Sequence, residues 1–281
     1  MKINKIKSNA KLNLALNITG KKKVLHKIES IIGFIDLHDV ISINQHNGKK
    51  HHISFYGKFS KNIRKKNTVQ KLFQILDKEN LLKNKKFEVK IKKLIPQEAG
   101  LGGGSMNAAN VFNYLIKKKI INLTYKKIRS ICNLVGSDVF LGIISSSCVL
   151  SSNGTVKKIN DTPKYYPFLV RPNFGCSTRK IYSAVKKYTK PLYRKPEKKM
   201  FGSKYLTNQQ NALETIAFKK YPKLKKIKLL LENINNPLFV RMTGSGSTIV
   251  AYYNSLKSCK LAQVKFKRKY KNYWSVTAKT I

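Results

Sequence analysis

The segment from Gly100 to Ser105, Gly-Leu-Gly-Gly-Gly-Ser, is the part of the sequence best suited to chemistry. Glycines let the backbone come close to an anion, and the amphipathic stretch that follows predicts a helix whose first N–H groups and positive dipole end favour phosphate. The segment is not a Walker A loop, because no Gly-Lys-Ser or Gly-Lys-Thr closes it, and Ser105 stands where a dinucleotide-binding loop has its third glycine. A loop without function is the alternative. The position between a predicted strand and a predicted helix favours phosphate binding.

A second glycine-rich segment, Thr243-Gly-Ser-Gly-Ser, lies between two apolar runs. A hairpin turn explains it as well as a second ligand-binding loop does, and both interpretations stay open at this point.

Few side chains in the chain can act as acids or bases, since only 12 residues are Asp or Glu. Asp138 follows Gly136-Ser137 and precedes the apolar run 139–144, so a helix N-cap is its ordinary explanation and a functional carboxylate the alternative. Lys11 lies on the polar face of a predicted strand, and nothing physical separates it from the other lysines. His26 is equally explained as a loop histidine. No spacing of His, Cys or acidic residues predicts a metal site made of side chains alone.

The charge of the chain is strongly positive, with 58 Lys and Arg against 12 Asp and Glu, a formal balance of +46. Such a balance is typical of nucleic-acid binding, but only seven of the 58 are Arg, the residue that recognises bases and phosphates with a bidentate fork. The lysines are spread along the whole chain, and Asn and Ile are also frequent, a bias toward residues with A- and T-rich codons. We therefore expect the charge to be background and expect no specific nucleic-acid partner.

The length of 281 residues, with 42% hydrophobic residues, is enough for one large or two smaller folded domains. No run approaches the roughly 18 apolar residues of a membrane span, so we expect no membrane association. The first residues are basic, but 12–18 is interrupted by Asn and no cleavage pattern follows, which argues against a signal peptide. Four cysteines lie far apart, and we expect a reducing, cytoplasmic setting.

The elements that must position these residues alternate between strand and helix patterns. Alternation predicts a strand over 11–18, and helical spacing predicts helices over 68–82 and after the glycine segment. Further strands are expected over 40–44, 52–56, 87–95, 146–151, 166–171, 238–242, 248–253 and 273–278, and further helices over 125–134, 139–144, 179–187, 208–219, 223–232 and 256–267, with a loop over 188–204. This mixture, with a turn at Asn153-Gly154 and a polar stretch over 157–164, predicts an α+β protein of two domains, 1–157 and 158–281.

Together these residues resemble the GHMP small-molecule kinases over nearly the whole chain. The triple glycine followed by Ser-x-Asn-Ala-Ala, together with the start Ala10-Lys-Leu-Asn-Leu, is the most specific part of the resemblance. The matching segments are 10–14, 18–20, 26, 34–36, 95–96, 99–105, 107–109, 136–139, 177–178, 182, 211–214 and 242–246. Within the family the chain is most similar to the branch that phosphorylates the 2-hydroxyl of 4-diphosphocytidyl-2-C-methyl-D-erythritol in the non-mevalonate route to isopentenyl diphosphate.

The resemblance implies an ATP- and Mg²⁺-dependent kinase with an N-terminal mixed α/β domain, a C-terminal ferredoxin-like α+β domain and a cleft between them. It implies that Lys11 and Asp138 are catalytic and that Asn13, His26, Thr178 and Tyr182 bind the acceptor. It implies that the ATP phosphates lie on Pro96, Gln97, Glu98, Ala99, Gly100, Leu101, Gly102, Gly103, Gly104, Ser105 and Met106. Another GHMP kinase is the nearest alternative, and a basic nucleic-acid-binding protein is a further one.

Three residues depart from the family pattern: Met106 replaces a second Ser, Phe140 replaces a Pro, and Leu25 replaces an aromatic before the histidine. If that aromatic stacks on cytosine in the family, Tyr182 is the main candidate for this role here.

Overall fold

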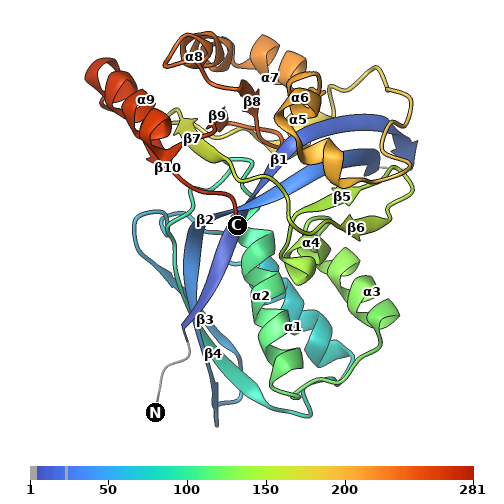
Figure 1. The fold of residues 1–281 in the computed structure, drawn as a ribbon. Helices are drawn as coiled ribbons and strands as arrows, with labels where there is room; N and C mark the ends of the chain where they lie inside the picture. Colours follow the sequence, from blue (N-terminus) through green and yellow to red (C-terminus); the bar gives the residue numbers. More distant parts are fainter. Residues whose placement is uncertain (1–4, 23–24) are drawn as a thin grey trace. The chain divides into compact units, whose positions relative to one another are not determined.

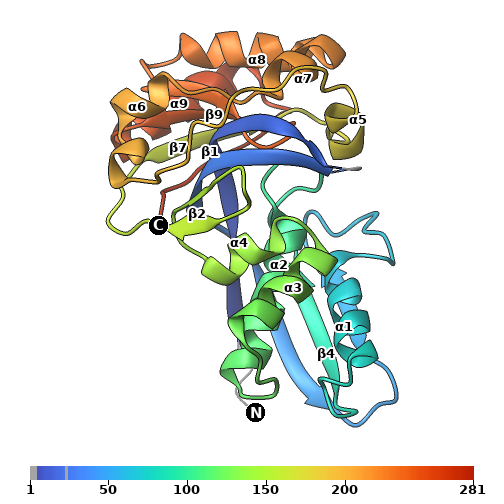
Figure 2. The same cartoon turned by 90° about the vertical axis from the view of Figure 1, so that its right-hand side faces the viewer.

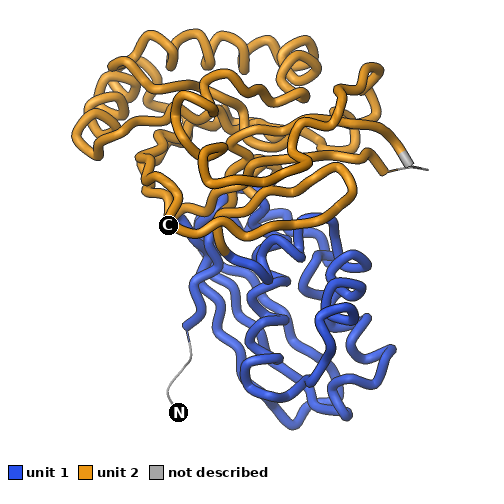
Figure 3. Tube along the Cα trace, turned by 45° about the vertical axis from the view of Figure 1, so that its right-hand side comes forward, with its two compact units in different colours: residues 1–10, 37–97, 102–145 blue, residues 11–36, 98–101, 146–281 orange. Residues whose placement is uncertain are grey.

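The computed structural model describes residues 5–22 and 25–281. The chain forms two compact units, shown in different colours in Figure 3. Of the described residues, unit 1 contains 5–10, 37–97 and 102–145, and unit 2 contains 11–36, 98–101 and 146–281. The strands β1 (Lys5–Lys22) and β2 (Leu25–His46) each run through both units. The predicted domains, 1–157 and 158–281, divide the chain at a single point, whereas each compact unit is built from several segments. The division at residue 157 therefore stays a prediction.

Unit 1 is a small sheet packed against helices (Figure 1). Its remaining elements are β3 (His52–Tyr56), α1 (Thr68–Lys78), β4 (Lys86–Lys92), α2 (Gly103–Lys117), α3 (Tyr125–Val135) and α4 (Val139–Ile144). β4 lies between β3, to which it is parallel, and the second half of β2, to which it is antiparallel. Alternate residues of β4, Phe87, Val89 and Ile91, are buried, and the ring of Phe73 from α1 lies 6.0 Å from that of Phe87. The helices therefore pack on the face of the sheet that these residues share.

Unit 2 contains the first half of β2, which pairs with β5 and through it with β6, and a separate four-stranded sheet. Its remaining elements are β5 (Cys148–Leu150), β6 (Val156–Lys158), β7 (Tyr166–Arg171), α5 (Thr178–Tyr182), the 3₁₀ helix η1 (Lys198–Phe201), α6 (Ser203–Thr207), α7 (Glu214–Lys220), α8 (Pro222–Glu232), β8 (Phe239–Met242), β9 (Ile249–Tyr253), α9 (Leu256–Lys269) and β10 (Trp274–Thr277). The four strands lie in the order β10-β7-β9-β8, all antiparallel. This is the βαββαβ arrangement of a ferredoxin-like domain, which confirms the fold expected for the C-terminal part.

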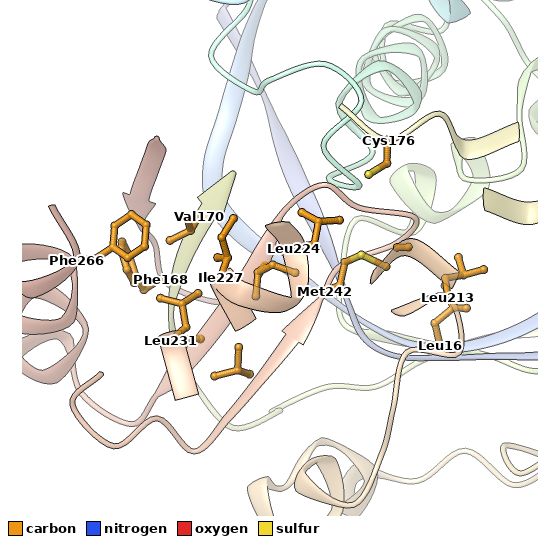
Figure 4. Close-up of a cluster of buried hydrophobic side chains, with 14 of the residues drawn as sticks. Leu16, Phe168, Val170, Cys176, Leu213, Leu224, Ile227, Leu231, Met242 and Phe266 are labelled. Atoms are coloured by element: carbon orange, nitrogen blue, oxygen red, sulfur yellow. The ribbon is translucent and has the colours of Figure 1, made fainter. Parts of the chain in front are cut away.

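The core of the four-stranded sheet lies between its strands and the helices α8 and α9 (Figures 2 and 4). Phe168 and Val170 are two residues apart on β7, so both side chains point to the same face. Leu224, Ile227 and Leu231 cover that face from α8, where spacings of three and four residues place them in one stripe.

Most expected elements are present, but several boundaries were wrong. The strands β1 and β2 are far longer than the segments 11–18 and 40–44, and the first half of β2 was not predicted. The helix α5 ends at Tyr182, because the chain then follows β1 and β5 through hydrogen bonds from Thr189 N to Ile18 O, 2.8 Å, and from Ser151 Oγ to Tyr193 O, 2.6 Å. The expected loop over 188–204 contains η1 and the beginning of α6.

Candidate functional site

The glycine-rich segment passes from one unit to the other, with Pro96 and Gln97 in unit 1, 98–101 in unit 2 and 102–106 again in unit 1. Residues 98–101 lie on the turn that joins β8 to β9. The backbone N–H groups of Ser247 and Thr248 donate to the carbonyls of Glu98 and Ala99, each over 3.3 Å, and Thr243 Oγ1 donates to Gly100 O over 3.2 Å. The second glycine-rich segment is therefore both a hairpin turn and the support for the first.

Glycine is required where these two segments meet. Gly100 has φ +74°, and a Cβ atom there would lie 2.0 Å from the carbonyl oxygen of Thr243. Gly244 has φ +54°, and its Cβ would lie 3.1 Å from Gly100 O. Any other residue at Gly100 has to push the two backbones apart.

Lys11 is distinguished from the other lysines by its burial, since only 4% of it is exposed. Its backbone N–H donates to Leu101 O over 3.1 Å, and its ammonium donates to the side-chain oxygen of Asn13. Asn13 is also buried, and it donates from its backbone to Thr243 Oγ1 (3.0 Å) and from its side chain to Ser30 Oγ (2.8 Å). The polar strand face that carries Lys11 is therefore not exposed to solvent. Tertiary contacts cover this face and bring both side chains to the glycine-rich segment.

The second part of the segment begins helix α2 in unit 1. Its N-cap, Gly102, is in the left-handed conformation at φ +68° and has no side chain to cap the helix. Among the described residues, the N–H groups of Gly103, Gly104 and Ser105 donate to no acceptor. The first turn carries no acidic side chain, so its positive dipole end is not neutralised there. These amides can accept an anion.

Asp138 occupies the N-cap position of α4, yet its side chain makes no capping hydrogen bond and is partly exposed. The ordinary explanation of a capping acid therefore does not account for its carboxylate. A Cβ at Gly136 would lie 3.9 Å from Ser105 Oγ, so the turn before Asp138 lies beside the first turn of α2. Unit 1 thus brings two parts of the predicted site together.

Two of the residues expected to hold phosphate have side chains with other contacts. The side chain of Met106 is buried against Gly142 of α4, where a Cβ would lie 3.1 Å from Met106 Sδ. The amide of Gln97 donates to the carbonyls of Phe59 and Lys61, over 3.1 and 2.7 Å. Because the side chain at position 106 packs in the core of unit 1, the apolar Met106 fits there in place of the family's serine. Phe140, the second departure, is buried with its ring edge-on to that of Tyr125.

The residues expected to bind the acceptor all lie in unit 2. The ring of His26 lies 5.4 Å from that of Tyr182 and 6.4 Å from that of Tyr188, a residue that was not predicted to belong to the site. Burial, with a smaller effect of Lys21, lowers the pKa of His26 below 6.5 and keeps the ring neutral at pH 7. The hydroxyl of Thr178 lies 3.0 Å from Ser245 Oγ in the β8–β9 turn.

Two further residues support the site and were not predicted to do so. Asn211 donates to the carbonyls of Met242 and Gly244, each over 2.8 Å, and thereby holds the β8–β9 turn. The second is Asp39, which is fully buried in unit 1. The order of family motifs could have pointed to Asn211. No local signal could have selected Asp39, because its side-chain partners are 54 and 68 residues away.

Residues 5–22 and 25–281 contain no group of three or more His, Cys, Asp or Glu side chains that could hold a metal ion. None of their helices combines the length and apolar composition that crossing a membrane requires.

The comparisons with known proteins agree on one family. Residues 67–148 match the model of the GHMP kinases N terminal domain. The 4-diphosphocytidyl-2-C-methyl-D-erythritol kinase of Pelagibacter ubique (strain HTCC1062) is 54% identical over 277 residues, which are 99% of each chain. The enzyme of the same name from Clostridium tetani (strain Massachusetts / E88) is 32% identical over 95% of this chain and 96% of its own.

Solved structures share the fold. A crystal structure of 4-(cytidine 5'-diphospho)-2C-methyl-D-erythritol kinase superimposes with a TM-score of 0.78 at 20% identity, covering 98% of this chain and 99% of the other. L. major mevalonate kinase in complex with R-mevalonate gives a TM-score of 0.69 at 15% identity, covering 99% and 95%. At these identities the likeness concerns the fold alone, and it confirms the expected two-domain α+β kinase fold.

Proposed function

Since this chain belongs to the GHMP kinase family of ATP-dependent phosphotransferases, we propose that it transfers the γ-phosphoryl group of ATP to the 2-hydroxyl of 4-diphosphocytidyl-2-C-methyl-D-erythritol. The name of the 54% identical relative supports this choice of acceptor. The observation that carries the proposal is the start of α2, where three successive N–H groups have no acceptor among the described residues and no acidic side chain lies in the first turn.

The phosphates of ATP bind to residues 96–106 in this proposal. The free N–H groups of Gly103, Gly104 and Ser105 donate to phosphate oxygens, and the absence of a Cβ at Gly103 and Gly104 lets the phosphates approach the backbone. Met106 contributes its backbone position only, since its side chain is in the core of unit 1.

The catalytic side chains are Lys11 and Asp138. Phosphoryl transfer requires mainly correct positioning and stabilisation of the charge that spreads over the transferred group. The Asp138 carboxylate orients the acceptor hydroxyl and takes its proton as the oxygen bonds to phosphorus. The Lys11 ammonium, oriented by Asn13, stabilises the negative charge.

The residues of unit 1 fit a magnesium ion of the kind that accompanies ATP. Mg²⁺ commonly takes only one or two protein oxygens and completes its shell with phosphate oxygens and water, so a cluster of acids is not needed. The hydroxyl of Ser105, in the first turn of α2, is the protein oxygen that would hold it. When bound, Mg²⁺ neutralises part of the charge on the phosphates.

The acceptor lies on unit 2 in this proposal. The faces of His26 and Tyr182 bind its pyrimidine, and the neutral imidazole can accept or donate a hydrogen bond at the base edge. Asn13 and Thr178 bind polar groups of the same molecule. The exposed Leu25, at 71% of its surface, adds no aromatic contact.

We also infer the setting of this reaction. The product continues along the non-mevalonate route to isopentenyl diphosphate, and the enzyme works in the cytoplasm. Residues 1–157 and 158–281 remain our proposed division of the linear sequence into domains.

One assay tests the proposal: release of ADP from ATP and Mg²⁺, measured with and without 4-diphosphocytidyl-2-C-methyl-D-erythritol. We expect acceptor-dependent ADP and a product phosphorylated at the 2-hydroxyl, identified by ³¹P NMR. Turnover of homoserine or mevalonate in place of this acceptor would instead assign the chain to another kinase of the family. Salt-sensitive binding of RNA without any ADP release would refute a kinase function altogether.

A further inference from the structure

Asp39, near the middle of β2 in unit 1, has a carboxylate with none of its surface exposed. One oxygen accepts the backbone N–H groups of Leu94 and Ile95, over 2.7 and 2.9 Å. The other accepts the Lys93 ammonium and, over 2.9 Å, the side-chain amide of Asn107. Four donors thus meet a group that offers about four acceptor positions, so the carboxylate is fully paired.

The donors come from the two segments on either side of the glycine-rich segment. Lys93, Leu94 and Ile95 follow β4 and lead directly to Pro96, while Asn107 is the fifth residue of α2. A single buried carboxylate therefore ties the entry of the phosphate-binding segment to the start of the second turn of the helix that follows it. A buried ion pair is by itself weak evidence of added stability, because the loss of hydration opposes the attraction. Its position suggests another role.

Gly103, the first residue of α2, lies against the side chains of two residues that Asp39 binds, Lys93 through its ammonium and Ile95 through its backbone N–H. A Cβ at Gly103 would lie 3.1 Å from Ile95 Cγ2 and 3.3 Å from Lys93 Nζ. The positions of these two side chains therefore limit where the backbone of Gly103 can lie. The N–H of Gly103 is one of the three donors without an acceptor, so its position affects the proposed phosphate site. The same contact keeps the Lys93 ammonium beside the end of α2 that is meant to receive phosphate.

The orientation of the Asn107 amide also depends on Asp39. Only the NH₂ end of an amide can face a carboxylate, so Asn107 Oδ1 must point the other way. This oxygen is buried and has no partner among the described residues. With a neutral amide at position 39, either end of the Asn107 side chain could face it, and the arrangement directly after the first turn of α2 would no longer be unique.

We propose that Asp39 is a positioning residue for nucleotide binding, which sets the place of the free N–H groups of α2 through Lys93, Ile95 and Asn107. This inference rests on the proposed function, since it takes the first turn of α2 to receive the ATP phosphates. It assigns to Asp39 no contact with the reacting atoms.

The test compares Asp39→Asn with the wild type by calorimetric titration with ATP and Mg²⁺ in the absence of acceptor. The substitution keeps the size of the side chain and removes the charge, so two of the four donors must turn away from the new NH₂ group. We expect the Kd for ATP to rise by about tenfold, because the free N–H groups of α2 would no longer be held where the phosphates need them and each hydrogen bond to a charged group that is weakened costs affinity of this order. The KM for the acceptor, which binds on unit 2, should stay within about twofold.

A matched control is Asp77→Asn, which removes another paired carboxylate of unit 1. Asp77 pairs with Lys86 at 3.0 Å and with His51 at 3.2 Å, and 37% of its side chain is exposed. Its Kd for ATP should equal that of the wild type. A purely structural role for Asp39 would lower the melting temperature and the number of binding-competent molecules without changing Kd, and that result would overturn the inference.

If Asp39→Asn does not fold, Asn107→Ser removes one donor and leaves Asp39 with its other three. We expect its Kd for ATP to rise severalfold, and an unchanged Kd would again refute the inference. The readout also separates this inference from the proposed function. If the wild-type chain binds ATP but releases no ADP with the diphosphocytidyl acceptor, the proposed kinase function is excluded. The role of Asp39 is then still tested by comparing the Kd for ATP of Asp39→Asn with that of the wild type.

Discussion

Replacing Gly100 with alanine tests how the two glycine-rich segments fit together in unit 2. The added Cβ would lie 2.0 Å from Thr243 O and 3.2 Å from Gly246 O, both backbone atoms that cannot rotate away. In addition, φ at Gly100 is +74°, a region that alanine rarely adopts. The substitution must therefore move the backbone of residues 98–101 away from the β8–β9 turn.

The cost can be worked out from the contacts that this movement removes. The left-handed conformation costs alanine about 1–2 kcal/mol. Three hydrogen bonds between the segments, from Thr243 Oγ1, Ser247 N and Thr248 N, contribute about 0.5–1.5 kcal/mol each. The smaller conformational freedom of unfolded alanine offsets up to about 1 kcal/mol of this. We expect the free energy of unfolding to fall by about 2–6 kcal/mol, a large part of the stability of an ordinary domain.

Urea denaturation followed by tryptophan fluorescence measures this change. Trp274 is the single tryptophan of the chain and lies on β10 of unit 2, paired with Arg171 of β7. The matched control is Gly33→Ala, whose Cβ would meet only Leu14 side-chain atoms at 3.5 Å or more, and which should change the unfolding free energy by less than about 1 kcal/mol. A loss below about 1 kcal/mol for Gly100→Ala, equal to the control, would refute the reasoning that the two backbones are in forced contact.

Three further predictions test the proposed site. Asp138→Asn should lower kcat by about 10²-fold or more, while the Kd for ATP changes by less than about twofold. Asp161→Asn is the control, and an unchanged kcat in Asp138→Asn would show that Asp138 is not catalytic. Gly104→Val should raise the KM for ATP by about tenfold, since its side chain occupies space that the phosphates need, and normal nucleotide kinetics would exclude this turn as the phosphate site. Because burial lowers the pKa of His26 below 6.5, the acceptor KM should be flat above pH 6.5 and should rise as the pH falls through the lowered pKa and the ring becomes charged. A His26→Asn variant should lose this pH dependence, and its persistence in that variant would assign it to another group.

The local patterns predicted the elements around the site well. The helix over 139–144 matches α4 (Val139–Ile144), the helix expected after the glycine-rich segment is α2, and the strand expected over 87–95 is present as β4 but ends at Lys92. Apolar spacing marks such elements because each buries one face against a neighbour. The order of motifs predicted the family, which the 54% identical relative confirms.

Boundaries were less predictable where the chain depends on distant partners. The first half of β2 has no clean alternation, because Ile31, Ile32, Phe34 and Ile35 are all buried and the strand is covered on both faces. The end of α5 depends on the contacts that the following residues make with β1 and β5, which no local signal reveals.

By itself, the sequence determined the glycine-rich segment, the helix that begins there and the kinase family, because these depend on residues close together in the chain. The family motif singled out Lys11 and Asp138, but only the tertiary structure showed what physically separates a functional lysine from the others. By composition Lys11 and Lys93 look like any other lysine among 58 basic residues, yet both are buried, and each donates to a buried side chain that offsets part of the cost of its burial. Burial and pairing arise from segments that are distant in sequence, so they could not be read from composition or spacing.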